Sequence, residues 1–347
     1  MKVIKVGTRL IGEGHKPFVI AEMSGNHNQS LERALQIVDA AAEAGADAIK
    51  LQTYTADTMT LKGVLEIEEE SLWKGYELHD LYQMAHTPWE WHQPIFERAK
   101  SLGIMAFSSP FDATAVDFLE TLDVPIYKIA SFENTDHPLL KKVAQTGKPV
   151  IMSTGVATLA DIDEAVRVLR ENGCQELILL KCTSTYPASP ETTNLATIPH
   201  LKSMFDCIVG LSDHTMGVGA SVASVVLGAS VIEKHFTLSR ADGGVDSAFS
   251  LEPAELKALV VESERAQLAL GKVQYGIQKA EKDSRKYKRS IYIAKDIKQG
   301  GTISMDNIKI IRPGFGLEPK YLDLVLNRAV GQDLKAGTPL TWDLLLK

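Results

Sequence analysis

Eight short runs of β-branched and apolar residues recur along the first 280 residues, and helical patterns separate them. The runs cover residues 18–24, 46–53, 104–109, 125–131, 149–154, 177–183, 207–212 and 230–236. Strict alternation of strand and helix predicts a parallel sheet, and eight such units in about 250 residues match a closed (β/α)8 barrel. A doubly wound open sheet is the alternative, but no G-x-G-x-x-G follows the first run. We therefore predict an α/β fold built on a (β/α)8, or TIM, barrel.

The first helical pattern, LERALQIVDAAAEA, has recognisable ends. Ser30 precedes it as a predicted N-cap, and Gly45 follows it as a predicted C-cap. The 3.6-residue period places the side chains of one face toward the barrel. This face is predicted to hold Leu31, Leu35, Val38 and Ala42.

Charge and pattern both change near residue 280. The net charge of the chain is -7, but residues 283–347 hold 12 Lys+Arg against 7 Asp+Glu, which is +5, so the remainder carries -12. Short alternating apolar runs and Gly-rich turns in this last segment are typical of a small mostly-β domain. We therefore predict a barrel domain at 1–280 and a second domain at 281–347. A long charged and aromatic insertion, 54–87, is predicted to cover a site in the first domain.

Several locations and partners are not expected. Cys174, Cys182 and Cys207 have no close pairing, which predicts reduced, buried thiols in a cytoplasmic protein and no metal site built from cysteines. No apolar segment at the start resembles a signal peptide, and the longest weakly polar run, 216–232, is too short for a membrane span. The basic C-terminal segment lacks interleaved aromatic residues, so we expect no nucleic acid partner.

Polar side chains end all eight predicted strands. In a (β/α)8 barrel, catalytic groups lie at the carboxyl ends of the strands and in the loops after them. Lys50 and Gln52 are two residues apart, and therefore share one face of their strand. Lys50, Lys128 and nearby hydroxyls would form a site for a small, multiply charged anion, because ammonium groups suit phosphate and carboxylate.

Two histidines end adjacent predicted strands. His214 lies in GLSDHTMG and His235 in VIEKHF, so their imidazoles can converge at one mouth of the barrel. Two neutral imidazoles with water suit a divalent transition metal that remains open to substrate. We expect Asp213 and Glu233 to orient these imidazoles or to bind the metal through water.

Taken together, the motifs of this chain resemble those of the sialic acid synthase family. The resemblance rests on IAEMSGNHNQS, SSPFD, YKIAS, STG, KCTSTYP, VGLSDHTMG, VIEKHF and RPGFG, and it covers essentially the whole chain. It implies a (β/α)8 barrel followed by a C-terminal antifreeze-like domain, in a domain-swapped homodimer where that domain reaches the partner's active site. Whether this domain acts in cis or in trans stays open in the sequence.

The resemblance also implies roles for individual residues. His214 and His235 would hold Mn²⁺, with Mg²⁺ and Co²⁺ as alternatives. A carboxylate would transfer the proton of the attacking water, and Glu22 and Glu133 are both candidates. Phosphoenolpyruvate would be bound by Lys50, Ser109, Lys128, Ser131, Ser153 and Ser212. The sugar and the metal-bound water would be contacted by Glu22, Gln52, Tyr186 and Asp246, and the sugar's N-acyl group by Arg312.

The activity implied is the condensation of phosphoenolpyruvate with an N-acylated aminosugar to a nine-carbon sugar acid and phosphate. Ser184 stands where N-acetylneuraminate-forming members commonly have Asn. This departure favours 2,4-diacetamido-2,4,6-trideoxy-hexose as the acceptor and a product of the pseudaminic acid type. N-acetylneuraminate and legionaminic acid synthesis remain alternatives. So does an aldolase that makes an eight-carbon sugar acid phosphate. A carbohydrate-binding module is the non-enzyme alternative.

Overall fold

The computed structural model describes residues 2–68 and 72–346, so the predicted insertion at 54–87 is described except for its residues 69–71. The chain divides into two compact units, Met1–Gly271 and Lys272–Lys347. Within the described residues, no helix is both long enough and apolar enough to cross a membrane.

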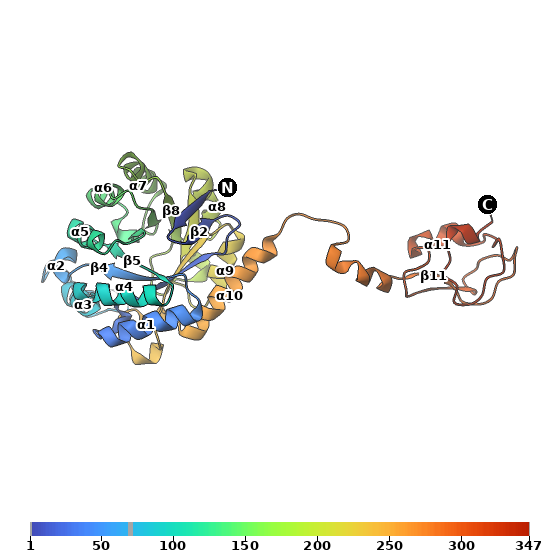
Figure 1. Cartoon of the computed structure of the whole chain (residues 1–347), viewed down its shortest axis with the longest axis horizontal. Coiled ribbons are helices and arrows are strands. Elements are labelled where there is room, and N and C mark those ends of the chain that lie inside the picture. The colour runs from blue at the N-terminus through green and yellow to red at the C-terminus, as the bar shows by residue number, and fades with distance from the viewer. Residues whose placement is uncertain (1, 69–71, 347) are drawn as a thin grey trace. The chain divides into compact units, whose positions relative to one another are not determined.

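The first unit is a closed barrel of eight parallel strands surrounded by helices (Figure 1). Around the barrel the order is β10-β3-β4-β5-β6-β7-β8-β9. The strands are β3 (Phe18–Glu22), β4 (Ala48–Thr53), β5 (Met105–Pro110), β6 (Tyr127–Ile129), β7 (Val150–Ser153), β8 (Leu177–Cys182), β9 (Ile208–Ser212) and β10 (Val231–His235). The pairing of β10 with β3 closes the ring, so the predicted barrel is confirmed and the open sheet is excluded.

Helices follow the strands and cover the outside of the barrel (Figure 1). They are α1 (Leu31–Ala44), α4 (His92–Ser101), α5 (Ala113–Thr121), α6 (His137–Ala144), α7 (Leu159–Glu171), α8 (Thr197–Phe205), α9 (Gly219–Val226) and α10 (Pro253–Leu270). The insertion after β4 adds α2 (Ala56–Met59) and α3 (Leu78–Ala85). The outward faces of the strands and the inward faces of the helices form two large apolar clusters.

Helix α1 confirms its predicted caps and the burial of Val38 on its predicted face, whereas Ala42 on that face is only partly buried. The Ser30 side chain accepts a hydrogen bond from the backbone N–H of Arg33, and Gly45 ends the helix with φ 87°. The buried residues are Ala34, Ile37, Val38, Ala41 and Ala44. Leu31 and Leu35 lie at the edge of this face and pack against the core while staying partly exposed. Small alanines occupy the centre of the contact because they let the helix approach the barrel closely.

An N-terminal hairpin that the sequence analysis did not predict closes the amino end of the barrel. Strands β1 (Val3–Val6) and β2 (Arg9–Gly12) pair antiparallel. Ile4, Val6 and Ile11 pack on Phe18 and the other apolar side chains inside the barrel. Burying each of these side chains contributes about 1.5–3 kcal/mol, so the hairpin is part of the core.

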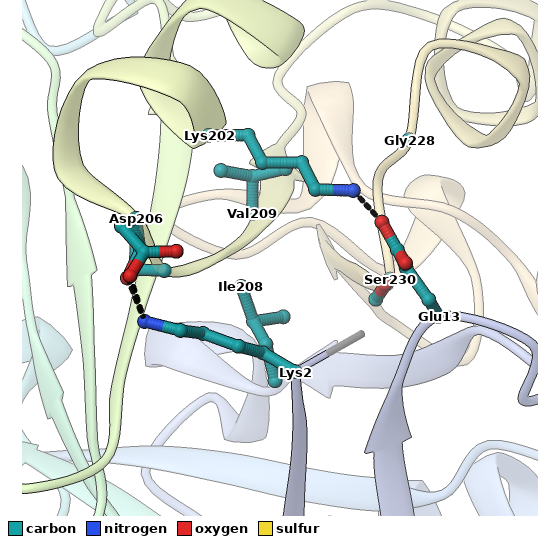
Figure 2. Close-up of a pocket in the computed structure, with 9 residues that line it drawn as sticks. Lys2, Glu13, Lys202, Asp206, Ile208, Val209, Gly228 and Ser230 are labelled. Atoms are coloured by element: carbon teal, nitrogen blue, oxygen red, sulfur yellow. Dashed lines mark hydrogen bonds and ion pairs between the residues drawn. The ribbon is translucent and has the colours of Figure 1, made fainter.

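Figure 2 shows a pocket of about 180 Å³ beside this hairpin. Lys2 pairs with Asp206, and Lys202 pairs with Glu13, so these four charges are offset within the pocket. The pocket is lined by Ile208 and Val209 at the start of β9, away from the strand ends where the functional residues are expected.

The second unit is small and mostly β. Strands β11 (Ser290–Ile293) and β12 (Ile308–Ile311) pair antiparallel, and isolated bridges and turns join the rest. A short helix, α11 (Leu322–Val325), completes a core of its own, with Ile291, Ile303 and Leu340 fully buried. Residue 280, the predicted domain boundary, lies inside this unit.

Candidate active site at the carboxyl ends of the barrel strands

The barrel register brings the predicted polar residues to one mouth. Glu22 at the end of β3 lies opposite Lys50 on one side and His235 on the other. Gln52 lies opposite Ser109. Because side chains alternate along a strand, Lys50 and Gln52 share a face, as do Glu233 and His235.

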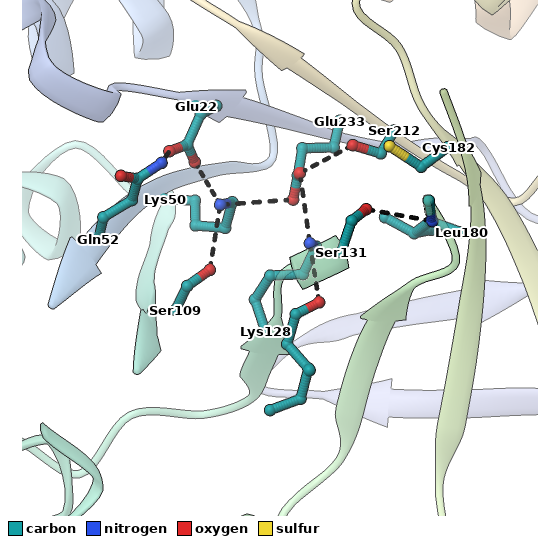
Figure 3. Close-up of polar contacts among 12 residues, drawn as sticks. Glu22, Lys50, Gln52, Ser109, Lys128, Ser131, Leu180, Cys182, Ser212 and Glu233 are labelled. Atoms are coloured by element: carbon teal, nitrogen blue, oxygen red, sulfur yellow. Dashed lines mark hydrogen bonds and ion pairs between the residues drawn. The ribbon is translucent and has the colours of Figure 1, made fainter. Parts of the chain in front are cut away.

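A buried network links two lysines to two glutamates (Figure 3). The Lys50 ammonium lies 2.6 Å from a Glu22 carboxylate oxygen, 3.8 Å from Glu233 and 3.2 Å from the Ser109 hydroxyl. Lys128 lies 3.6 Å from Glu233 on its other side. Glu233 therefore stands between the two ammonium groups, and Ser212 donates a hydrogen bond to it at 3.2 Å.

Burial determines the charge states in this network. It raises the pKa of Glu22, and the neighbouring Lys50 offsets only part of that change. Burial also acts against the ionised form of Glu233, but Lys128 and Lys50 outweigh it and lower its pKa. Lys128 has a pKa lowered by burial. The network therefore places two lysines against two carboxyl groups in a buried site.

Asp213 and Glu233 pair with lysines, so the expectation that they orient the imidazoles is wrong, and binding of the metal through water stays a prediction. Instead of orienting the imidazoles, Glu233 pairs with the lysines described above. Asp213 lies 3.0 Å from the ammonium of Lys234 and accepts hydrogen bonds from Ser221 and the Thr215 backbone N–H. Lys234 alternates with Glu233 and His235 and therefore points to the other face of β10.

His214 and His235 lie side by side, with ring centroids 5.4 Å apart. The Nδ1 of His214 is 3.0 Å from the carbonyl oxygen of Thr183. A carbonyl only accepts, so Nδ1 carries the proton and Nε2 keeps a lone pair. The Nδ1 of His235 is buried without a hydrogen-bond partner, 3.7 Å from Asp246. Burial lowers the pKa of His235. Two such imidazoles, one fixed in tautomer and one unsatisfied, fit a shared divalent ion.

A cavity of about 320 Å³ opens beside His235. Its polar lining includes most of the residues predicted to bind a sugar. It also includes two serines that follow strands β3 and β6. These polar residues are Ser24, Gln52, Ser131, Glu133, Tyr186, His235 and Asp246. Ser24 donates a hydrogen bond to Asp246, and burial raises the pKa of that carboxyl group. The Tyr186 ring lies 4.4 Å from that of His214.

The insertion after β4 forms the apolar wall of this cavity. Met59, Ile67, Leu78, Leu81 and Tyr82 line it. The Trp73 indole N–H donates to the carbonyl of Val245 at 2.9 Å, and its ring lies 5.6 Å from that of Tyr186. The insertion therefore covers the mouth of the barrel.

Glu133 differs from the other carboxylates. Burial raises its pKa to about 7, although Lys128 offsets part of the change. One of its oxygens is buried without a hydrogen-bond partner. A carboxyl group that titrates near neutral pH can both accept and release a proton under working conditions.

Two features near Ser131 and His214 went unrecognised in the sequence. An added Cβ at Gly155 would meet the hydroxyl of Ser184 at 2.2 Å and that of Ser131 at 2.6 Å, so only glycine fits there. Cys182 is buried as predicted, but its sulfur contacts the Nδ1 of His214 at 4.0 Å. The predicted Ser153 hydroxyl is buried and has no partner, whereas Arg312 belongs to the second unit.

Comparison with known proteins identifies the family. The model of the NeuB family matches residues 37–275, and that of the SAF domain matches residues 288–346. The chain belongs to the NeuB family. The predicted resemblance is therefore confirmed, and the small C-terminal domain is a SAF domain.

Individual relatives agree with this assignment. A pseudaminic acid synthase of Campylobacter jejuni is 45% identical, covering 94% of this chain and 95% of the relative. An N,N'-diacetyllegionaminic acid synthase of the same species is 37% identical, covering 92% and 97%. The crystal structure of an N-acetylneuraminic acid synthetase from Leptospira borgpetersenii in complex with citrate is 34% identical with a TM-score of 0.74, covering 82% and 96%.

Proposed function

We propose that this enzyme condenses phosphoenolpyruvate with 2,4-diacetamido-2,4,6-trideoxy-hexose to give a nine-carbon acid of the pseudaminic acid type and phosphate. Identity of 45% to a pseudaminic acid synthase against 37% to a diacetyllegionaminic acid synthase favours this sugar. The observation that carries the chemistry is the buried pair of lysines next to the two histidines at one barrel mouth.

Phosphoenolpyruvate would bind on the lysine side. Lys50 and Lys128 would attract its charges, with hydrogen bonds from the hydroxyls of Ser109, Ser131, Ser153 and Ser212. The unsatisfied Ser153 hydroxyl supports this, because buried polar groups normally have partners. These cations would also stabilise the charge that develops on the departing phosphate.

His214 and His235 would hold the divalent ion, for which we propose Mn²⁺. The free Nε2 of His214 and the unsatisfied Nδ1 of His235 support this assignment. When bound, the ion supplies Lewis acidity for an aldehyde. Asp246, 3.7 Å from His235, would contact the sugar and hold water beside this pair.

The reaction joins C3 of phosphoenolpyruvate to the aldehyde carbon of the open-chain sugar. Water adds at C2, and phosphate leaves with cleavage of the C–O bond. For the proton of this water we choose Glu133 over Glu22, because Glu22 is paired with Lys50 at 2.6 Å, whereas Glu133 has an unpaired oxygen and a pKa of about 7. Gln52 and Tyr186 would position the sugar.

The acceptor would carry no phosphate. Among the described residues that line the 320 Å³ cavity, none is lysine or arginine, while Glu133 and Asp246 are acidic. A phosphorylated acceptor would be repelled there. The apolar wall suits acetamido methyl groups and a deoxygenated C6. Both features of the cavity disfavour the alternative aldolase, which makes an eight-carbon sugar acid phosphate.

We also propose a domain-swapped homodimer in the cytoplasm. The SAF domain would complete the partner's active site, where Arg312 would touch the N-acyl group of the sugar. The SAF match at 288–346 and the separate core of this unit support a domain that acts as a module.

A phosphate-release assay tests the proposed function. Acylated hexosamines with and without a terminal phosphate are supplied with phosphoenolpyruvate and Mn²⁺. We expect turnover with the unphosphorylated diacetamido sugar, and its loss on chelation or in His214→Ala. Full activity after chelation would rule out the metal, and turnover only with phosphorylated sugars would favour the alternative aldolase.

A further inference from the structure

A second cluster of metal-binding side chains lies in the insertion that covers the cavity. Glu77, His79 and Asp80 occupy the start of helix α3, and one ligand atom from each lies within 4.8 Å of the others. None of these residues belongs to the site formed by His214 and His235. The cluster is small, and its carboxylates alone would not define a site.

The orientation of His79 is the observation that points to a ligand. Its side chain is buried, with 5% of the residue exposed. Its Nε2 lies 2.8 Å from a carboxylate oxygen of Asp57. A carboxylate accepts, so Nε2 carries the proton and Nδ1 presents a lone pair.

That Nδ1 is buried without a hydrogen-bond partner, and the Asp80 carboxylate lies 4.0 Å away. A lone pair beside carboxylate oxygens is an unfavourable contact that a proton or a metal ion between them relieves. We propose that Glu77, His79 and Asp80 bind a divalent transition-metal ion.

The donor set fits such an ion. One imidazole and two carboxylates are ligands typical of zinc and related metals, with bonds of about 2.0–2.2 Å. Ligand atoms in tetrahedral coordination are about 3.3–3.6 Å apart at these bond lengths, so the side chains must move closer by roughly 1 Å on binding. Asp80 is exposed and free to move. Glu77 already accepts a hydrogen bond from the Gly63 backbone N–H at 2.9 Å, which holds it near the cluster.

Asp57 would act as the residue that positions the histidine. A carboxylate that accepts the second N–H of a metal-binding imidazole fixes its tautomer and ring orientation. Asp57 belongs to α2, whereas the three ligands belong to α3 and its N-cap. The ion would therefore sit on α3, and the hydrogen bond between His79 and Asp57 would link its site to α2.

The consequence is a metal-stabilised wall for the active site. Leu78, Leu81 and Tyr82 of α3 and Met59 of α2 line the cavity proposed to bind the sugar. An ion on α3 would fix the orientation of His79, and the hydrogen bond of His79 to Asp57 would hold α2 and α3 together. Its role would be structural, since its ligands do not line the cavity.

Equilibrium dialysis of the full-length protein against Zn²⁺, with metal counted by mass spectrometry, tests this site. We expect His79→Gln and Asp80→Asn each to bind one ion fewer per chain than the unsubstituted protein. Asp57→Asn keeps the three ligands but should weaken this ion's binding about 10–100-fold. Circular dichroism checks that each variant is folded. If His79→Gln is not folded, the surface substitution Asp80→Asn alone tests the site.

Two further variants locate the ion. Glu90→Gln removes an exposed carboxylate outside the cluster and should not change the count. His214→Ala should remove a different ion, so its combination with His79→Gln should lose both. Equal Zn²⁺ counts for the unsubstituted protein, His79→Gln and Asp80→Asn would overturn the proposal, whatever His214→Ala does to the proposed catalytic ion.

Discussion

The carboxyl group of Glu133 is protonated over a wider pH range when the protein is folded. Its pKa rises from an ordinary value of 4.5 to about 7, mainly through burial. Between these two values the folded state holds a proton that the unfolded state has lost. The contribution of Glu133 to stability therefore falls as pH rises through this window, and is lowest above pH 7.

Glu133→Gln should remove this loss. Relative to the unsubstituted protein, we expect the variant to gain stability progressively between pH 4.5 and 7, by about 1–3 kcal/mol in total. Urea unfolding followed by circular dichroism at several pH values measures the difference. A difference that does not change with pH would show that Glu133 is ionised normally in the folded protein.

Gly155→Ala tests the proposed contact of Ser131 with phosphoenolpyruvate. The added Cβ would displace the hydroxyls of Ser131 and Ser184. Loss of a hydrogen bond to a charged group costs about 1.5–3 kcal/mol, so KM for phosphoenolpyruvate should rise roughly 10–100-fold. Gly219→Ala is the control, because an added Cβ there meets nothing within 4 Å. Equal KM values for both variants would contradict the assignment of Ser131.

At the residue scale, the strand face on which a side chain lies was easier to predict than the side chains with which it pairs. Strand alternation placed Lys50 and Gln52 on one face of their strand, because a spacing of two residues can be read from the sequence. The role of Glu233 was missed because its pairing with Lys50 and Lys128 depends on neighbours across the barrel. Those neighbours are fixed by strand register, which a single sequence does not show.

The N-terminal hairpin is the element whose loss should affect stability without affecting substrate binding. Ile11 is 0% exposed and packs inside the amino end of the barrel, whereas its neighbour Leu10 is 40% exposed. Ile11→Ala should lower the free energy of unfolding by about 2–5 kcal/mol and leave KM unchanged. Leu10→Ala is the matched control, with little expected effect. Equal losses in urea unfolding would mean that the hairpin does not close the core.

Helices and strands were predicted correctly where their hydrophobic pattern was long or was repeated along the chain. The eight barrel strands are continuous buried runs between capped helices, which is the pattern of a parallel sheet. Strands β1 and β2 are four residues each, with exposed and buried positions mixed. Such short segments carry too little periodicity, and their burial depends on the barrel that they close.

At the scale of the whole molecule, mixed dimers test whether the SAF domain acts on the partner's site. His214→Ala chains have an inactive barrel and an intact Arg312. Arg312→Ala chains have an intact barrel and lack the arginine. In a swapped dimer, one site of each mixed dimer is complete. We expect mixing, after dissociation and reassociation, to restore about a quarter of the unsubstituted activity. No recovery from verified mixed dimers would show that Arg312 acts in its own subunit.

The SAF domain should be needed for turnover and not for folding of the barrel. The two units have separate cores. A chain ending at residue 280 should therefore keep the circular dichroism of a folded barrel while losing most turnover. Full turnover by this truncated chain would remove the proposed role of the C-terminal domain, and isolated carbohydrate binding by residues 281–347 would favour a binding module.

The central claim is tested most directly by the mass of the product. The enzyme is incubated with phosphoenolpyruvate, Mn²⁺ and 2,4-diacetamido-2,4,6-trideoxy-hexose. The account predicts one phosphate released for each sugar acid formed, whose mass equals the sum of both substrates and water minus phosphoric acid. Phosphate release without this nine-carbon product, or no reaction with this sugar while another acceptor is converted, would contradict it.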